Sequence, residues 1–220
     1  MKLQTILAIE SATGDGSISL WRGGTEELLE TSNSNSSRAE RIISEIDSLL
    51  RNASVSKGEL DLIAVSVGPG SYSGIRIGVS TALGLGHSLG VPVVGVSVLE
   101  ALASGTALQK VIAVVPIGRS DLAWQIFDGD PDGNKRAIAE PSLDPVSTFR
   151  DSLKGHHELP VVAPEHCVES LRDIVGVSHG VMGIESSLAS TVARLAAQGG
   201  RSFSNPRPIY MRSAVARSGT

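Results

Sequence analysis

The chain has 220 residues and a mass of 22.8 kDa, and 41% of its residues are apolar, which is enough to build a buried core in one domain or two small lobes. This composition excludes a wholly disordered chain. Nineteen basic against 23 acidic residues give a net charge of −4. That charge argues against an autonomous nucleic-acid-binding protein, so a role on RNA requires a basic partner.

The compartment is indicated by three features of the sequence. Cys167 is the single cysteine, which excludes an intrachain disulfide and favours a reducing environment. The apolar run at residues 7–9 ends at Glu10 and is too short for the core of a signal peptide. The uncharged run 77–99 is long enough for a membrane span, but its five glycines, three serines and proline indicate a buried helix followed by a buried strand. We therefore expect a cytoplasmic protein that does not contact a membrane.

The first predicted elements are an antiparallel meander and a helix. Glycine-rich turns separate three short strands near residues 7–9, 17–21 and 26–30. Ser37 and Glu40 then fit a capping box at the start of a helix. Its apolar stripe consists of Ala39, Ile42, Ile43, Ile46, Leu49, Leu50 and Ala53.

A second helix is predicted at residues 73–90, between aliphatic strands at 60–67 and 91–96. Its only charged residue is Arg76, and small or apolar side chains surround its axis, so a single sheet cannot cover it. Small residues at steps of four form a smooth ridge on which another helix could pack closely. The ridge consists of Gly70, Gly74, Gly78, Ala82, Gly86 and Gly90. We predict that something beyond the sheet covers this helix.

The element order predicts two lobes. A short helix at 97–105 is expected to close an N-terminal lobe of residues 1–105, leaving a smaller, degenerate lobe and basic tail at 106–220. In the second part, strands are predicted near 111–115, 123–128 and 136–140, and helices near 145–153, 164–175 and 185–198. Three strands followed by alternating helices and strands are typical of an α/β half-domain of the actin, hexokinase and Hsp70 (ASKHA) superfamily. We expect this two-lobed fold with a reduced second lobe.

The turn between the first two strands is a candidate nucleotide loop. It contains Thr13, Gly14 and Gly16, and its glycines would let backbone amides reach a phosphate. Glu10 and Asp15 could hold a hydrated magnesium ion there. Aspartate and glycine are also ordinary turn residues, and this simpler interpretation is favoured.

The segment 68–76 joins a buried strand to a helix N-terminus, where free amides and the helix dipole attract anions. It matches neither a Walker loop nor the dinucleotide fingerprint, so turn geometry and helix packing are the favoured interpretation. The five histidines never have the i, i+4 spacing of helical metal ligands. Cys167 directly follows His166, and adjacent residues on a helix point about 100° apart. We therefore predict no catalytic residue and no metal ligand.

Four segments resemble the bacterial TsaB (YeaZ) family. They are ILAIESAT at 6–13, GPGSYSGIRIG at 68–78, GVS at 95–97 followed by Leu99, and PIYMR at 208–212. The resemblance covers the first 105 residues closely and the rest thinly, and the long glycine block is its specific signal.

The resemblance implies a two-lobed actin-like fold and a non-catalytic subunit of the machinery that transfers threonylcarbamoyl to the adenosine beside the tRNA anticodon. In this family the subunit binds and activates a catalytic paralogue, TsaD, which carries a metal-binding His-x-x-x-His on its first helix. An ATPase, TsaE, joins them. Family members pair through the first two helices of the N-terminal lobe. Carried over to this chain, the partner interface comprises Ile42, Ile43, Ile46, Leu49, Gly70, Gly74, Gly78 and Ala82.

The resemblance also implies that no cofactor is intrinsic, that ATP or ADP binds only at the assembled complex, and that tRNA is reached through the complex. We expect the chain alone to associate with itself. The chain departs from the family in two places. Arg38 stands near the histidine that often begins the first helix, and of the family's Asp-Ala-Arg entry to the second lobe only Arg119 matches.

Two alternatives remain open at this stage. An independent ASKHA-type ATPase or small-molecule kinase is motivated by the turn at 14–16, but it needs an adenosine loop in the second lobe, for which only residues 180–183 are available. A protease would need a nucleophile–base pair or a metal site, and the sequence shows neither.

Overall fold

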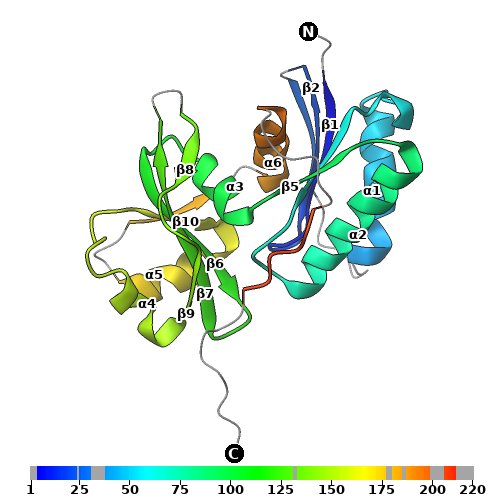
Figure 1. Ribbon diagram of the computed structural model, residues 1–220. Helices are drawn as coiled ribbons and strands as arrows, with labels where there is room; N and C mark the ends of the chain where they lie inside the picture. Colours follow the sequence, from blue (N-terminus) through cyan, green and yellow to red (C-terminus); the bar gives the residue numbers. More distant parts are fainter. Residues whose placement is uncertain are drawn as a thin grey trace, which may run out of the picture.

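Two mixed β-sheets divide the chain into two lobes, as Figure 1 shows. The computed structural model describes residues 4–23, 25–30, 38–130, 133–176, 180–184, 187–198 and 206–211. The predicted capping residue Ser37 lies outside this part of the chain. The two-lobed α/β architecture that the element order predicts is confirmed.

The first sheet has the strand order β3-β2-β1-β4-β5. Its strands are β1 (Thr5–Glu10), β2 (Ser17–Arg22), β3 (Thr25–Glu30), β4 (Leu62–Ser66) and β5 (Val93–Val96). The first three pair antiparallel, as their short turns require, whereas β1, β4 and β5 pair parallel. Every residue of β1 and β4 is buried, which explains why these segments are aliphatic without alternation.

Helices cover both faces of this sheet. α1 (Arg38–Asn52) and α2 (Tyr72–Leu89) lie on one face and α6 (Leu188–Ala197) on the other (Figure 1). α2 begins where the Ser71 side chain accepts a hydrogen bond from the Gly74 amide at 3.2 Å. It ends at Gly90, whose φ of +68° is the left-handed conformation of a helix C-cap.

The second sheet repeats the strand order of the first and adds a sixth strand, Ser142–Pro145, which pairs with the strand Asp121–Gly129. Its order β11-β10-β6-β7-β8 is the order β5-β4-β1-β2-β3, with the same pattern of parallel and antiparallel pairs. Its helices are short: α4 and α5 have seven and eight residues, against 15 and 18 in α1 and α2. The remaining elements are η1 (Lys57–Glu59), α3 (Val98–Ser104), β6 (Lys110–Ile117), β7 (Asp121–Gly129), β8 (Lys135–Ala137), β9 (Ser142–Pro145), α4 (Val146–Ser152), β10 (Val161–Pro164), η2 (Glu165–Cys167), α5 (Val168–Val175) and β11 (Val181–Ile184).

The structure corrects the sequence interpretation of the second lobe in three places. β9, β10 and β11 are four-residue strands that the sequence does not predict. The segment 180–183 is not an adenosine loop, because Val181–Ile184 pairs in parallel with β10. α6 belongs to the first lobe in space, although it lies within residues 106–220, because its apolar side packs on β1 and β2 and its Ala189 amide donates to Ser17 Oγ at 3.2 Å.

The uncharged run 77–99 folds as predicted into part of α2, followed by β5 and the start of α3. Within the described ranges, no helix has the length and hydropathy that a membrane span requires. The largest buried cluster extends from the first sheet across α3 to β6, so apolar packing joins the two lobes. A second, separate cluster fills the space between the second sheet and α4 and α5.

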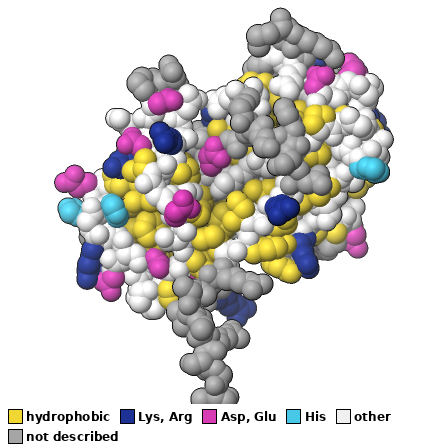
Figure 2. All heavy atoms as spheres, in the orientation of Figure 1, with side chains coloured by type: hydrophobic (Ala, Val, Ile, Leu, Met, Phe, Trp, Pro, Cys, Tyr) yellow, Lys and Arg dark blue, Asp and Glu magenta, His cyan; other side chains and the backbone are white. Residues whose placement is uncertain are grey.

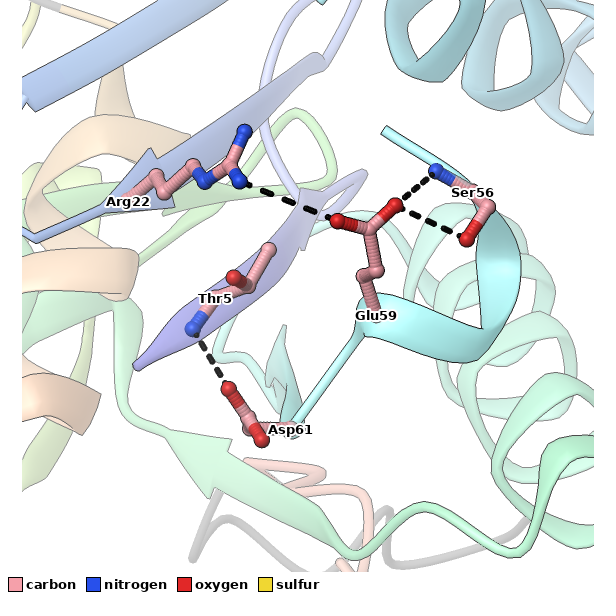
Figure 3. A network of polar contacts seen from close by, with 5 residues as sticks. All are labelled: Thr5, Arg22, Ser56, Glu59 and Asp61. Carbon is pink, nitrogen blue, oxygen red and sulfur yellow. Dashed lines mark hydrogen bonds and ion pairs between the residues drawn. The ribbon is translucent and has the colours of Figure 1, made fainter. Parts of the chain in front are cut away.

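A polar network fastens the start of β1 (Figure 3). The Glu59 carboxylate accepts hydrogen bonds from the amide and the hydroxyl of Ser56, both at 2.8 Å, and lies 3.7 Å from the Arg22 guanidinium. These hydrogen bonds lower the pKa of Glu59. Asp61 accepts a hydrogen bond from the Thr5 amide at 2.9 Å. This network lies at the N-terminal end of β1. The opposite end of the strand, at Glu10, faces the second lobe.

Candidate functional site

The predicted nucleotide loop is filled by a side chain of the protein itself. Glu10 ends β1, is only 3% exposed, and turns back beneath the loop. Its Oε1 accepts hydrogen bonds from the amides of Ala12 and Thr13 at 2.7 and 2.9 Å, and from Ser66 Oγ at 3.4 Å. Its Oε2 accepts a hydrogen bond from Thr13 Oγ1 at 3.2 Å. Two amides that a phosphate could use are therefore already bound to a carboxyl group.

Burial raises the pKa of Glu10 above its usual value of 4.5, because a charged carboxylate loses hydration there. The two amides and the Arg38 guanidinium act in the opposite direction, since they stabilise the charged form. The Glu10 carboxyl group is thus oriented inward and engaged by the loop amides, and magnesium binding at this loop stays a prediction.

Arg38 connects the same loop to α1. Its guanidinium donates hydrogen bonds to the carbonyl oxygens of Ser11 and Gly14. Burial lowers the pKa of Arg38, and the nearby carboxylates of Glu10 and Asp15 partly restore it. Arg38, which stands near the place where the resemblance implies a histidine, therefore holds the loop in position. In the part of the chain that the structure describes, no group of three His, Cys, Asp or Glu side chains could hold a metal ion.

Two cavities lie between the lobes, and the loop residues Thr13 and Gly14 line both. The first, of about 250 Å³, is also lined by Glu165, His166, Ser187 and Leu188, among others. The second, of about 450 Å³, is also lined by Ser71, Tyr72, Ile117, His166 and Cys167, among others. The sequence contains no local signal for this arrangement, since residues near position 14 and position 166 meet only in the folded chain.

The surroundings of Cys167 and His166 do not favour a nucleophile–base pair. The imidazole of His166 lies against the Gly14 backbone, where a Cβ would be 2.9 Å from His166 Cε1. Burial raises the pKa of the Cys167 thiol, which disfavours the thiolate that a nucleophile requires. Arg119, the one match in the second-lobe motif, lies in the exposed turn between β6 and β7.

Most of the predicted partner interface is buried inside the chain itself. On α1, Ile42, Ile46 and Leu49 are at most 3% exposed, whereas Ile43 is 53% exposed. The three buried side chains belong to the core cluster of the first lobe. Only Ile43 of this set is accessible to another molecule.

The glycine ridge of α2 faces the chain's own first sheet and its flanking loop. A Cβ at Gly74 would overlap the carbonyl oxygen of Ser11, and one at Gly78 would overlap Ser11 Oγ. A Cβ at Gly70 would overlap the carbonyl oxygen of Ala12, and Ala82 is fully buried. The interpretation of the ridge as a partner surface is therefore wrong: the missing side chains let the helix approach β1 and the loop after it.

The outward side of the two-helix layer, here called the outer face, is formed by other residues. Ser80 and Gly84 of α2 are exposed and Ile77 is half-buried, and their spacing places them opposite the buried glycines. A Cβ at Gly84 would meet no atom within 4 Å. Together with Ile43 of the adjacent α1, these residues make up the outer face, and the exposed Arg76 stands one helical turn before Ser80.

Comparison with known proteins gives matches for both sequence and fold. The model of the family described as "TsaD: tRNA N6-adenosine threonylcarbamoyltransferase" matches residues 32–148, which is more than half of the chain. The tRNA threonylcarbamoyladenosine biosynthesis protein TsaB of Escherichia coli is 30% identical over 151 residues, which cover 63% of each chain. The protein of the same name from Bacillus subtilis is 37% identical over 100 residues, covering 46% of this chain and 44% of that one.

An uncharacterized protein of Mycobacterium tuberculosis is 28% identical over 175 residues, or 78% of this chain and 82% of that protein. Among solved structures, YeaZ from Pseudomonas aeruginosa superposes with a TM-score of 0.75 at 20% identity, covering 94% of this chain and all of the other. That structural match shows the same fold. Taken together, the family model, the TsaB sequences and the fold show that the chain belongs to the TsaB (YeaZ) family.

Proposed function

We propose that this protein is a non-catalytic subunit of the tRNA threonylcarbamoyladenosine machinery, and that it binds a TsaD-type catalytic paralogue through the outer face of α1 and α2. Two observations outside the chain support the reaction: the names of the TsaB relatives, and the description of the matching family as a tRNA N6-adenosine threonylcarbamoyltransferase. The docking role is supported by the exposed outer face of α1 and α2.

The state of the loop supports a non-catalytic role. In a phosphate loop the backbone amides point at the ligand. Here the amides of Ala12 and Thr13 donate to Glu10, and Arg38 holds the carbonyl oxygens on either side of them. A nucleotide would have to displace a buried, hydrogen-bonded carboxyl group to use these amides.

The outer face supports the docking role because its residues have no evident task within the chain. Ile43 exposes half of its surface although it lies beside a fully buried stripe. Gly84 sits in a helix interior, where glycine costs about 1 kcal/mol relative to alanine, and no neighbouring atom requires its small size. A helix of a partner could approach closely over Gly84 and Ser80 and cover Ile43 and Ile77.

The same proposal covers the remaining partners. A TsaE-type ATPase joins the pair, ATP or ADP binds only in the assembled complex, and tRNA is contacted through that complex in the cytoplasm. In the absence of the paralogue, the outer face pairs with a second copy of the chain.

A charge placed on the outer face tests the proposal. Ile43→Asp is expected to weaken binding to the TsaD-type paralogue at least tenfold, about 1.4 kcal/mol, because a carboxylate would be buried in an apolar contact. Gly84→Arg is expected to act in the same direction by blocking close approach. Binding is measured by isothermal titration calorimetry with the paralogue of the same organism.

Ile138→Asp is the matched control, because Ile138 is 49% exposed and lies next to β8 in the second lobe. It should bind the paralogue like the unmodified chain. Equal affinities for all three variants would contradict the docking face. The ATPase alternative makes a different prediction, namely magnesium-dependent ATP binding by the isolated chain, which the same calorimeter measures directly.

A further inference from the structure

The only two tyrosines of the protein meet on its surface, although they stand 138 positions apart in sequence. Their ring centroids are 4.9 Å apart, with the planes tilted by 39°. Tyr72 is 57% exposed and Tyr210 is 42% exposed. In a chain with 3% aromatic residues, an exposed pair of rings contributes little to the core, so its position calls for another explanation.

The fold fixes both rings in place. Tyr72 is the first residue of α2. Tyr210 lies on the segment 206–211, which runs from beside β5 of the first sheet toward the junction of the two lobes (Figure 1). The Ile209 amide donates to the carbonyl oxygen of Val67 at 2.7 Å, and Pro206 lies close against Gly95. The rings therefore stand on a held backbone rather than on a free tail.

A positive charge accompanies the rings. The guanidinium of Arg76, one turn further along α2, lies 4.5 Å from the centroid of the Tyr72 ring. Among the residues that the structure describes, no carboxylate pairs with Arg76. None of the described carboxylates therefore competes with an anion for this charge, in a protein whose net charge is −4.

A cavity of about 320 Å³ opens beside this cluster. It is lined by Gly70, Tyr72, Ile117, Ile209, Tyr210 and Met211. Gly70, Tyr72 and Ile117 also line the larger cavity between the lobes, so the two cavities are neighbours. On the face shown in Figure 2, hydrophobic side chains gather at the junction of the lobes, with Lys or Arg side chains at their border.

We propose that Tyr72, Tyr210 and Arg76 form a binding site for a nucleobase and its phosphate. Aromatic rings receive any base by stacking, arginine supplies charge to the neighbouring phosphate, and a cavity of this volume holds one flat ring system. The base belongs either to an unpaired nucleotide of RNA or to a free nucleotide. The inference rests on the proposed function, since the tRNA machinery contains both RNA and free nucleotide. It assigns to this subunit a direct contact with one of them, which the docking role does not require.

The test uses the complex of the full chain with its TsaD-type paralogue and two probes, an anticodon stem-loop RNA and ATP. Tyr210→Ala is expected to weaken binding of one probe about 5- to 150-fold, the range for loss of one stacked base. Tyr210→Phe keeps the ring and should stay within about twofold of the unmodified complex. If RNA is the ligand, Arg76→Gln should reduce the slope of log affinity against log salt by about one. Fluorescence anisotropy measures both quantities.

A benzophenone amino acid at position 210 identifies the neighbour independently, since irradiation joins it to whatever lies within reach. A crosslink to the RNA or to the nucleotide supports the site and tells the two sources apart. A crosslink to the paralogue alone, together with weaker assembly of Tyr210→Ala, shows a protein contact and overturns the proposal. Unchanged affinity of Tyr210→Ala for both probes also overturns it, while the effect of Ile43→Asp on assembly reports separately on the proposed function.

Discussion

Replacing Gly74 with alanine is expected to lower the free energy of unfolding by about 3 kcal/mol, at the upper end of the usual cost of overpacking. The new Cβ would overlap the carbonyl oxygen of Ser11, a backbone atom that cannot rotate away. Ser11 is fully buried, and its hydroxyl donates to the Gly74 carbonyl oxygen at 2.7 Å, so the two segments are held together. Relief requires α2 to move away from the end of β1, which would also disturb the loop that Arg38 and Glu10 fix.

Gly84→Ala is the matched control on the same helix. Nothing lies within 4 Å of its Cβ position, so the substitution should raise the free energy of unfolding by about 1 kcal/mol, the ordinary difference in helix propensity. Gly78→Ala should fall between the two, because its clash is with the Ser11 hydroxyl, which belongs to a side chain. Urea unfolding followed by circular dichroism measures all three, and equal effects at Gly74 and Gly84 would contradict the packing described here.

These glycines also show where sequence reasoning succeeds and where it stops. The charge-poor segment between two aliphatic strands predicts a buried helix, and α2 confirms it within one residue at each end. The direction that the glycines face does not follow from their spacing, because a small residue suits a close sheet as well as a close partner. Ile43 and Gly84 can be identified as an exposed surface only when the structure shows that the sheet covers the opposite sides of α1 and α2.

The second lobe was harder to predict for a different reason. β10 and β11 contain four residues each, and a run such as Val161–Pro164 is too short to show a period. β10 lies between β6 and β11 and is buried throughout, so its position is defined by strands distant in sequence. The helix α6 has a clear apolar stripe, but the spacing of its apolar residues does not show which of the two sheets the stripe packs on.

The candidate loop illustrates the same limit at the level of single side chains. Glycine and aspartate at 14–16 predict a turn, and the turn is present. Whether its amides are available to a ligand depends on Glu10, whose side chain could point outward toward a metal ion or inward toward the loop. The tertiary structure determines the inward orientation of Glu10, since Ser66 of β4 and Arg38 of α1 both place polar groups on the inward side.

Removing the Glu10 side chain is expected to be the most damaging change at the loop. Glu10→Ala leaves the amides of Ala12 and Thr13 without their acceptor in a buried place, and we expect a loss of about 3 kcal/mol in the free energy of unfolding. Glu10→Gln keeps an oxygen at the position of Oε1 and can still meet Thr13 Oγ1, so its cost should stay within about 1 kcal/mol. Thermal and urea unfolding of the two variants measure the difference.

The pH dependence of stability in the unmodified protein and in Glu10→Gln shows whether burial or the neighbouring donors dominate the pKa of Glu10. Because the pKa of Glu10 is raised on folding, the folded protein keeps this proton to a higher pH than the unfolded chain does. The stability of the unmodified protein relative to Glu10→Gln should therefore be greatest below pH 4.5 and decline as the pH rises through the folded pKa. Glu59 and Asp47, whose pKa values are lowered, shift stability in the opposite sense, but they are present in both proteins and cancel in the comparison. A relative stability that rises with pH would instead mean that the two amides and Arg38 outweigh burial, and that the loop holds a charged carboxylate in place of a neutral acid.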